Sequence, residues 1–454
     1  MIKNYIKKIS SLVVILMLFA TINVNVNVNA VTVTNSSTIN IKDFGAHSID
    51  EAGYSKFDSS SAINSAINFA KKNGALSVDF GSGRYYAKDI DLFSNLTYFS
   101  TQKAELIASP DTQLWHSVLT ADNQSNITIQ GLTINGNKDV VLGNDQEGSE
   151  LIALNTSNNI NISNCYLYNN WYIAVLLQNN CNYVTVNNNK IYDTDCGIAS
   201  SQGASSNLLI DGNTIYGNKN QMSEPIAIYN TNSKLAHDIT ITNNIIHDKL
   251  NASGILVMNA TKVLIKGNTV YNLYQGITVG IDYSMTGSQV TVASDITITE
   301  NNISKCTGGI ISEVNNSTIS KNVISNLKGV GIWLAKRNVQ SPITNNTIVD
   351  NKITNINSVG GQEPAIRLEN TSSCIVDKNI VSDTRAKILH YFIIQITGDN
   401  SSNNVIQNNT NLGAIVKNSF QIYLQSAKTT TVKNNIAKIL DQGTGSILLN
   451  NKIR

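Results

Sequence analysis

Short apolar runs with a period of two recur along almost the whole chain, and pairs of polar residues, often asparagine, separate them. In HDITITNNIIHDKLNASGILVMN (237–259), Ile239 and Ile241 alternate with polar residues before Asn243 and Asn244. A second apolar run follows the asparagines, and a Gly-Ile pair opens a third. Alternation of this kind is typical of half-buried β-strands. Each repeat is therefore expected to contain three strands.

The same phrase recurs at spacings mostly from 21 to 33 residues, with variable insertions. Periods in this range indicate a solenoid. The aligned asparagines are Asn189, Asn213, Asn244, Asn268, Asn301, Asn322, Asn351, Asn379, Asn409, Asn435 and Asn451, and Leu132 and Cys165 fill the slot in the first two copies. Three strands per turn, stacked at ~4.8 Å per coil, predict an all-β fold: a right-handed single-stranded parallel β-helix of about 12–13 coils.

The asparagines have a structural explanation. A two-residue corner needs a residue that tolerates left-handed backbone angles, and Asn is the best after Gly. Stacked in register, each side-chain amide can bond to the copies above and below it. Asn244 and its equivalents are therefore expected to be scaffold rather than catalytic residues.

The first thirty residues carry the features of a secretory signal peptide. Lys3, Lys7 and Lys8 precede an apolar stretch of about 12 residues, and Val28-x-Ala30 suits signal peptidase. A membrane span needs ~20 apolar residues, so the stretch is too short for an anchor. We expect a secreted, extracellular protein, either released or held at the cell surface, without membrane insertion.

A helical pattern from Ala62 to Lys72 differs from the strand pattern around it. Ser59 to Ser61 offer an N-cap, and Gly74 follows the end. One amphipathic helix ahead of a solenoid would cover the apolar core and block edge-to-edge growth. The expected organisation is a signal peptide at 1–30, a strand-and-helix cap at 31–90 and the β-helix at 91–454, whose final strand has no visible cap.

Charge narrows the choice of partners. The chain has 33 Lys and Arg against 31 Asp and Glu, and loss of the three leader lysines leaves 30 against 31. A nearly neutral protein lacks the basic field of a general nucleic-acid or membrane-surface binder. Attraction to an anionic partner would have to be local.

The cysteines do not indicate a disulfide framework. Their number is odd and their spacing does not repeat, so buried free thiols are expected. The five are Cys165, Cys181, Cys196, Cys306 and Cys374. No CxxC or HExxH phrase is present, and a structural zinc site is not expected.

The segment that begins at Asp43 resembles the opening of the pectate-lyase-like β-helix superfamily. DFGA at 43–46, Asp58 before the helix and VDFGSGRY at 78–85 match that superfamily's Asp-Phe-Gly-Ala phrase, its Asp-rich helix start and a strand ending in a Pro-Gly-Thr-Tyr-like turn. The usual Gly-Asp-Gly is replaced here by HSIDEAGYSKF. The resemblance implies the fold but leaves the activity open, because the superfamily includes lyases, hydrolases, epimerases, phage tailspikes and non-catalytic surface proteins.

The resemblance also implies that substrate lies along the outside of the sheet formed here by the Gly-Ile strands. Since the Ile of each Gly-Ile pair faces inward, alternation identifies the outward residues. Coil by coil they are Leu176/Gln178, Ala199/Ser201, Ala227/Tyr229, Leu256/Met258, Thr278/Gly280, Ile311/Glu313, Trp333/Ala335, Arg367/Glu369, Gln395/Thr397 and Tyr423/Gln425.

Charged and aromatic residues gather in the later coils of this row, although only 14% of the chain is charged. Three successive coils and the next loop contribute Glu313, Trp333, Lys336, Arg337, Arg367, Glu369, Arg385, Lys387, His390 and Tyr391. The early coils carry no comparable set. The later coils are therefore the candidate site.

These residue types suit a uronic-acid polymer, which offers a carboxylate and an acidic proton on the adjacent ring carbon. A cation stabilises the carbanion-like intermediate, a base removes the proton, and an aromatic face stacks on a sugar ring. We expect catalytic roles for Arg367 as a carboxylate clamp and for Lys336, His390 or Tyr391 as the base. The expected substrate-binding residues are Arg337, also a clamp, Trp333 as the platform, and Glu313, Glu369 and Arg385.

Two alternatives stay open at this point. Arg367 and Glu369 could pair with neighbours as a plain surface network, worth under ~1 kcal/mol. A hydrolase would need two or three carboxylates at the glycosidic bond. Asp193 and Asp195 echo the Asp-Asp phrase of polygalacturonases, but no Gly-His-Gly or Arg-Ile-Lys follows.

No metal ligand is assigned. Asp193 and Asp195 could bind Ca²⁺, although such a site needs six or more oxygens and the sequence shows two. The favoured function is that of a lyase or epimerase acting on an acidic polysaccharide. The alternatives are a polygalacturonase-type glycoside hydrolase and a non-catalytic, glycan-binding surface protein.

Overall fold

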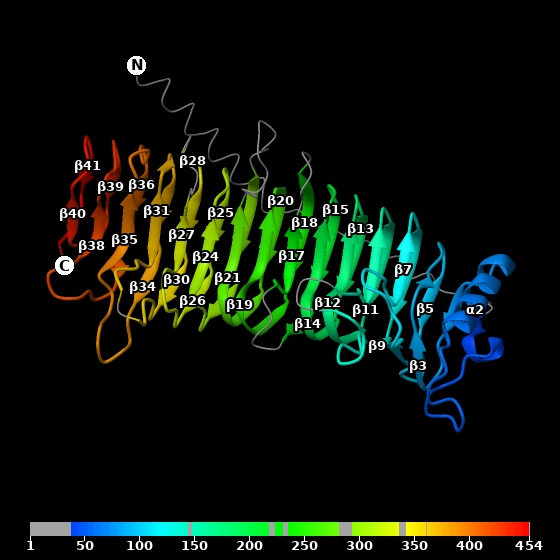
Figure 1. Ribbon diagram of the computed structural model, residues 1–454. Coiled ribbons are helices and arrows are strands. Elements are labelled where there is room, and N and C mark those ends of the chain that lie inside the picture. The colour runs from blue at the N-terminus through cyan, green and yellow to red at the C-terminus, as the bar shows by residue number, and fades with distance from the viewer. Residues whose placement is uncertain are drawn as a thin grey trace, which may run out of the picture. The chain divides into compact units, whose positions relative to one another are not determined.

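The computed structural model describes residues 38–143, 148–217, 223–229, 235–280, 293–335, 342–359 and 361–453. The predicted signal peptide lies outside these residues, as do Lys336 and Arg337. The described chain is an all-β, right-handed parallel β-helix with a single α-helix among its described elements. Its strands lie side by side along one axis (Figure 1).

A 16-stranded sheet contributes one strand to each coil, and all its pairings are parallel. Two of the sixteen precede residue 91, which leaves fourteen coil starts in the described part of 91–454, close to the predicted number of coils. Its strands are β1 (Thr38–Asn40), β2 (Ser77–Asp79), β5 (Thr97–Phe99), β8 (Ser125–Gln130), β11 (Asn158–Ser163), β13 (Asn182–Asn187), β15 (Ser206–Asp211), β18 (Ala236–Thr242), β20 (Ala260–Lys266), β22 (Ser294–Thr299), β25 (Thr318–Ser320), β29 (Thr347–Val349), β33 (Ile375–Asp377), β36 (Val405–Gln407), β39 (Thr431–Lys433) and β41 (Ile447–Leu449).

A 23-stranded sheet forms the rest of the wall, and β28 (Ile343–Thr344) pairs with β32 (Thr371–Ser372) in a small third sheet. The larger sheet contains β3 (Arg84–Ala87), β4 (Ile90–Asp91), β6 (Glu105–Ala108), β7 (Leu119–Asp122), β9 (Thr133–Asn135), β10 (Ile152–Asn155), β12 (Tyr166–Gln178), β14 (Lys190–Ser201), β16 (Thr214–Tyr216), β17 (Ile226–Tyr229), β19 (Ile245–Met258), β21 (Thr269–Gly280), β23 (Asn302–Ser304), β24 (Gly308–Ser312), β26 (Val323–Ser325), β27 (Ile332–Leu334), β30 (Lys352–Thr354), β31 (Ile366–Glu369), β34 (Ile380–Ser382), β35 (Phe392–Thr397), β37 (Asn411–Leu412), β38 (Phe420–Leu424) and β40 (Ile439–Asp441).

Four coils differ from the prediction of three separate strands. In β12, β14, β19 and β21, the predicted second and third strands are joined into one strand of 12 to 14 residues. The bend is absorbed by register shifts, between Asn170 and Ile173 in one pair and between Lys249 and Ser253 in another. At each shift the chain bends and the ladder is locally disrupted, and pairing with the next coil resumes beyond it.

At each asparagine corner, one residue takes the left-handed backbone conformation and the next, an asparagine, forms the side-chain ladder. Asn243 takes the left-handed conformation (φ 55°), whereas Asn244 is fully buried. The Asn244 backbone N–H and Nδ2 both donate to Oδ1 of Asn268, at 2.9 and 3.0 Å, and Nδ2 also donates to the Ile210 carbonyl at 2.9 Å. The same pattern continues to Asn451, which confirms the predicted ladder. Cys165 joins it through its backbone N–H, which donates to Asn189 Oδ1 at 2.9 Å.

The predicted helix is present as α2 (Ser60–Asn73), preceded by the 3₁₀ helix η1 (Ile41–Phe44). Gly74 ends α2 in the left-handed region (φ 66°), as expected. The N-terminal acceptor differs from the prediction, because Asp58 Oδ1 accepts from the Ser60 N–H at 2.8 Å and Ser59 makes no side-chain cap bond.

The helix packs into the common core through four buried residues, Ile63, Ala66, Ile67 and Ala70. Figure 1 places α2 at one end of the stacked coils and β41 near the other. At that other end, the three side chains of β41 are about half exposed. That α2 prevents edge-to-edge association stays a prediction.

Candidate functional site

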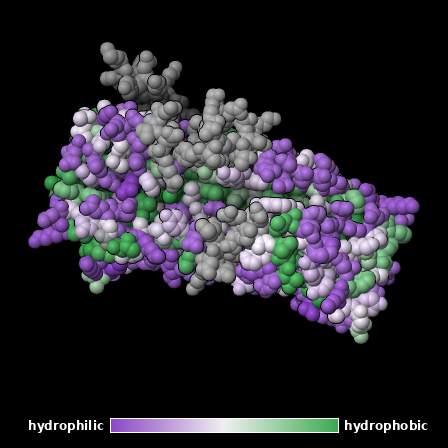
Figure 2. All heavy atoms as spheres, viewed as in Figure 1, coloured by the Kyte–Doolittle hydropathy of each residue, from purple (hydrophilic) through white to green (hydrophobic). Residues whose placement is uncertain are grey.

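The outward row predicted from alternation is in register from coil to coil. The first residue of each predicted pair lies opposite its predicted neighbour, from Leu176 with Ala199, through Ile311 with Trp333 and on to Gln395 with Tyr423. The core-facing Ile residues alternate with them and are buried. Figure 2 shows a largely hydrophilic exterior on the face in view, with hydrophobic residues in small patches.

Trp333, Arg367 and Glu369 meet on the outward side of β27 and β31. The Arg367 Cζ atom lies 5.3 Å from the centroid of the Trp333 ring, and Trp333 Nε1 donates to Glu369 Oε2 at 3.0 Å. Arg367 Nη2 also pairs with Glu363 Oε2 at 2.9 Å, and its Nε donates to Gln395 Oε1 at 3.2 Å. The arginine therefore covers one face of the indole, and a carboxylate balances its charge.

Glu313 is the most enclosed of the predicted binding residues that the structure describes, with 5% of its surface exposed. It follows β24, and its N–H donates to the Val279 carbonyl at 2.9 Å. A side chain at Gly280 would come within 3.3 Å of Glu313 Oε2, so the glycine leaves the room in which this carboxylate lies. Glu313 is thus packed against the preceding coil.

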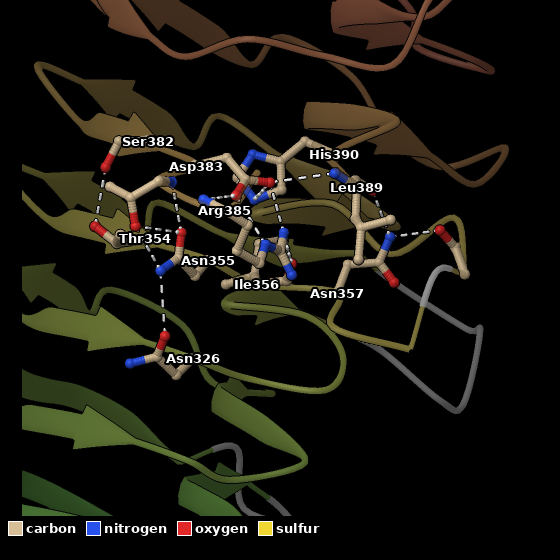
Figure 3. Close-up of polar contacts among 12 residues, drawn as sticks. Asn326, Thr354, Asn355, Ile356, Asn357, Ser382, Asp383, Arg385, Leu389 and His390 are labelled. Atoms are coloured by element: carbon tan, nitrogen blue, oxygen red, sulfur yellow. Dashed lines mark hydrogen bonds and ion pairs between the residues drawn. The ribbon is translucent and has the colours of Figure 1, made fainter. Parts of the chain in front are cut away.

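The predicted loop between β34 and β35 folds around the carboxylate of Asp383 (Figure 3). Arg385 donates to it from Nε at 2.7 Å and from Nη2 at 2.6 Å, and the Leu389 N–H donates at 3.2 Å. Arg385 Nη2 also donates to the Ile356 carbonyl at 2.7 Å. Burial raises the pKa of Asp383, but these hydrogen bonds outweigh it and hold the pKa at about 2. Arg385 is therefore a structural partner of Asp383.

His390 lies inside the same loop and has no exposed surface. Its Nε2 is 3.8 Å from Asp383 Oδ2, and burial lowers its pKa to about 4 (Figure 3). Tyr391, the next residue, is half-buried. The structure brings Arg367, Trp333 and Glu369 together, and it does not bring His390 to their surface.

Asp193 and Asp195, the alternative carboxylate pair, are also enclosed. Asp193 forms an ion pair with Lys138, and both side chains are largely buried. Asp195 is fully buried and its Oδ1 accepts from the Ser223 N–H at 3.3 Å. Within the described residues, no three His, Cys, Asp or Glu side chains are grouped so that they could hold a metal ion.

An open pocket of about 490 Å³ lies over the first coils, outside the candidate region predicted from the sequence. Its floor is the same outward row continued toward the N-terminus, where Asp91 lies opposite Thr120, Thr120 opposite Ala153 and Ala153 opposite Leu176. The lining residues are Asp89, Asp91, Trp115, His116, Ser117, Thr120, Asp122, Glu150, Ala153, Asn155, Leu176 and Gln178.

The carboxyl groups of this pocket differ in their surroundings. Glu150 is 5% exposed, and Ser117 Oγ donates to its Oε2 at 2.8 Å. Burial raises the pKa of Glu150, and the Ser117 hydrogen bond opposes this only in part. Asp91 and Asp122 are exposed, and Asp122 Oδ1 accepts from Asn155 Nδ2 at 2.7 Å. One carboxyl whose pKa is raised by burial therefore faces a cavity that it shares with two exposed carboxyl groups.

Trp115 and His116 form the rim. The Trp115 side chain is 57% exposed, and its ring meets Tyr172 edge to face with centroids 5.5 Å apart. The Trp115 backbone N–H donates to the Gly148 carbonyl at 2.9 Å, which fixes the backbone close to Glu150. His116 Nδ1 lies 2.8 Å from Asp89 Oδ1.

The signal for this pocket was weak but present. β7 and β10 alternate as the later strands do, but they lack the Gly-Ile phrase from which the row was built. Continuing the row by register would have placed Asp122 and Asn155 beside Gln178. Trp115 and Glu150 come from connecting segments, whose positions no periodicity indicates.

Two further expectations concern the whole described chain. All five cysteines are buried and free, as predicted. Among the described residues, no helix is long and apolar enough to cross a membrane.

The sequence matches the family described as the right-handed β-helix region over residues 116–246, 226–410 and 293–453, which together span well over half of the chain. The chain belongs to this family. The resemblance to pectate-lyase-like proteins is thereby confirmed for the fold. A search of curated proteins found no match.

Several solved structures are similar in fold. The A-module of the mannuronan C-5 epimerase AlgE4 from Azotobacter vinelandii is 14% identical, with 90% of this chain and 99% of that one covered and a TM-score of 0.58. The tailspike protein of E. coli bacteriophage HK620, in complex with a pentasaccharide, is 14% identical over 90% of this chain and 78% of its own, with a TM-score of 0.56. PfbA, a surface adhesin of Streptococcus pneumoniae, is 16% identical over 88% and 90%, with a TM-score of 0.50.

Proposed function

We propose that this β-helix protein binds a polysaccharide on its outward face and hydrolyses a glycosidic bond in the pocket over the first coils. One observation carries the proposal: a buried carboxyl with a raised pKa, Glu150, faces the same cavity as the exposed Asp91 and Asp122. Glycosidases pair a protonated carboxylic acid with an ionised carboxylate in this way. Trp115 adds an exposed aromatic surface suited to a sugar ring.

The roles follow from the surroundings of each group. Glu150 would protonate the leaving glycosidic oxygen, because burial keeps its proton bound to a higher pH. Asp122 or Asp91 would serve as the second carboxylate. Two proteins of similar fold support the choice of a glycan, since one is a mannuronan epimerase and another is seen with a pentasaccharide.

The test is release of reducing ends from a panel of acidic, neutral and amino polysaccharides. Glu150→Gln keeps the shape of the side chain and an acceptor for Ser117, but removes the acid, so kcat should fall ~100-fold or more. Asp399→Asn, an exposed acid near the other end of the solenoid, is the matched control and should keep full activity. Equal activity of Glu150→Gln and the unmutated protein would contradict the proposal.

β-Elimination or epimerisation of a uronate polymer at Arg367 is the second candidate. The favouring observation is that Arg367 lies on the outward face against Trp333 and bonds to Gln395, on the strand that follows Tyr391. Ultraviolet absorbance during incubation with polygalacturonate, alginate or glycosaminoglycans, with and without Ca²⁺, would detect the double bond left by elimination. A rise that Arg367→Ala abolishes would favour the lyase, whereas reducing ends without absorbance would favour hydrolysis.

Binding without either product would favour a non-catalytic glycan-binding protein. We also propose that the protein acts outside the cell, as residues 1–30 predict. Its recovery from the culture medium, with the N-terminus at or near residue 31, would test this.

A further inference from the structure

We propose that the pocket over the first coils selects a glycan that carries protonated amino groups. The inference rests on the proposed function, because it names the class of substrate taken by the same pocket. It differs from the uronate polymer expected from the sequence.

The lining of the pocket is acidic. Asp89, Asp91, Asp122 and Glu150 line the pocket, and none of its described lining residues is Lys or Arg. His116 pairs with Asp89, and Glu150 keeps its proton in its proposed role as the acid, which leaves Asp91 and Asp122 as carboxylates without a basic partner among those lining residues. A cleft lined by one sign of charge concentrates ligands of the opposite sign. Because the chain as a whole is almost neutral, the selection is local to this pocket.

The carboxyl groups of the pocket are not arranged to coordinate one metal ion. Ca²⁺ needs six or more oxygens at 2.3–2.6 Å, and Mg²⁺ needs near-octahedral oxygens at 2.0–2.1 Å. Asp91 is on β4, Asp122 is on β7 and Glu150 precedes β10, so the three belong to successive coils spaced ~4.8 Å apart. No metal-holding group of three was found in the described chain. The carboxylates of Asp91 and Asp122, which lie on different coils, suit separate amines along a polymer better than one ion.

The rest of the pocket surface includes amide and aromatic side chains. Asn155 and Gln178 contribute amide groups that can bond to sugar hydroxyls, and Trp115 is held by Tyr172 with 57% of its surface exposed. An ammonium group over the face of an indole gains a cation–π contact. A sugar with a free amine is complementary to carboxylates, amides and indole together.

The test is calorimetric binding of three hexasaccharides to the purified full-length mature protein: glucosamine, N-acetylglucosamine and galacturonate. The glucosamine hexamer should bind about tenfold or more tightly than its acetylated form, which corresponds to ~1.4 kcal/mol. Raising NaCl from 20 to 200 mM should weaken that binding, because salt screens exposed charges. Asp91→Asn and Asp122→Asn should each reduce affinity up to about fivefold. Asp399→Asn should change nothing.

Other outcomes would overturn either the inference about the amino sugar or the proposed function itself. Equal affinity for the glucosamine and acetylated hexamers would overturn the inference while leaving glycan binding at the pocket intact. Tightest binding of the galacturonate hexamer would overturn it and favour Arg367. Tetralysine binding as tightly as glucosamine would identify a basic peptide as the ligand. Failure of all three sugars and of every polysaccharide in the reducing-end panel would remove the proposed function itself.

Discussion

Two regions of one outward face use their charged residues in opposite ways. In the later coils, Arg367 pairs with Glu363 and lies on Trp333, whose ring nitrogen bonds to Glu369. Over the first coils, carboxylates face an open cavity without a Lys or Arg among its described lining residues. Charges that neutralise each other leave little for a ligand, whereas charges facing a cavity are available for binding. The densest run of charge in the sequence therefore lies where charged side chains pair with each other, and the sparser one lies where carboxyl groups face an open cavity.

The largest expected effect is acid sensitivity of the later region. Burial holds the pKa of His390 at about 4 when folded, against ~6.5 when unfolded, so the unfolded chain binds more protons between these values. The free energy of unfolding should therefore be intact above pH ~6.5 and fall by up to ~3 kcal/mol as pH drops toward 4. Asp383, with a folded pKa of about 2, adds a loss only below pH ~4.

Urea unfolding at pH 7 and pH 4.5 would measure this difference. His390→Gln should flatten the decline, and His237→Gln, which changes a partly exposed histidine, should keep it. A decline of the same size in both variants would show that His390 is not its source.

The next effect separates the two tryptophans by stability. Trp333→Ala removes a half-buried ring together with its contacts to Arg367 and Glu369, and should lower the free energy of unfolding by ~2 kcal/mol. Turnover of any glycan that is cut should stay unchanged. Normal stability with lost turnover would instead make Trp333 part of the site.

The smallest expected effect is at Trp115, where a substitution should weaken ligand binding and leave stability almost unchanged. Trp115→Ala changes an exposed side chain, so stability should shift by no more than ~0.5 kcal/mol. Oligosaccharide affinity should fall about tenfold, or ~1.4 kcal/mol, by calorimetry. If affinity is unaffected while Trp333→Ala weakens binding, the comparison between the regions is inverted.

The fold could be predicted because its determinants are local and periodic. Alternation placed Ile239 and Ile241 inward, and the repeated asparagine slot fixed the coil-to-coil register at Asn244. Where a choice depended on side-chain geometry the prediction was less accurate, as at the start of α2, where Asp58 rather than Ser59 provides the acceptor.

The candidate site was harder to predict because it depends on contacts between coils. The sequence showed which outward residues of the later coils are charged, but not that Arg367 would be paired with Glu363 or that His390 would be buried. Glu150 and Trp115 come from connections between strands, where periodicity says nothing about position. The approach of Glu150 to Asp122 follows only from the stacking of neighbouring coils.

The most direct test of where the ligand binds is backbone hydrogen exchange with and without the hexasaccharide that binds best. Ligand should slow exchange in segments 113–123 and 148–156, which surround the pocket, and leave 363–369 unchanged. Slower exchange at 363–369 and 391–397, with 113–123 unaffected, would contradict the central claim and place the ligand at Arg367.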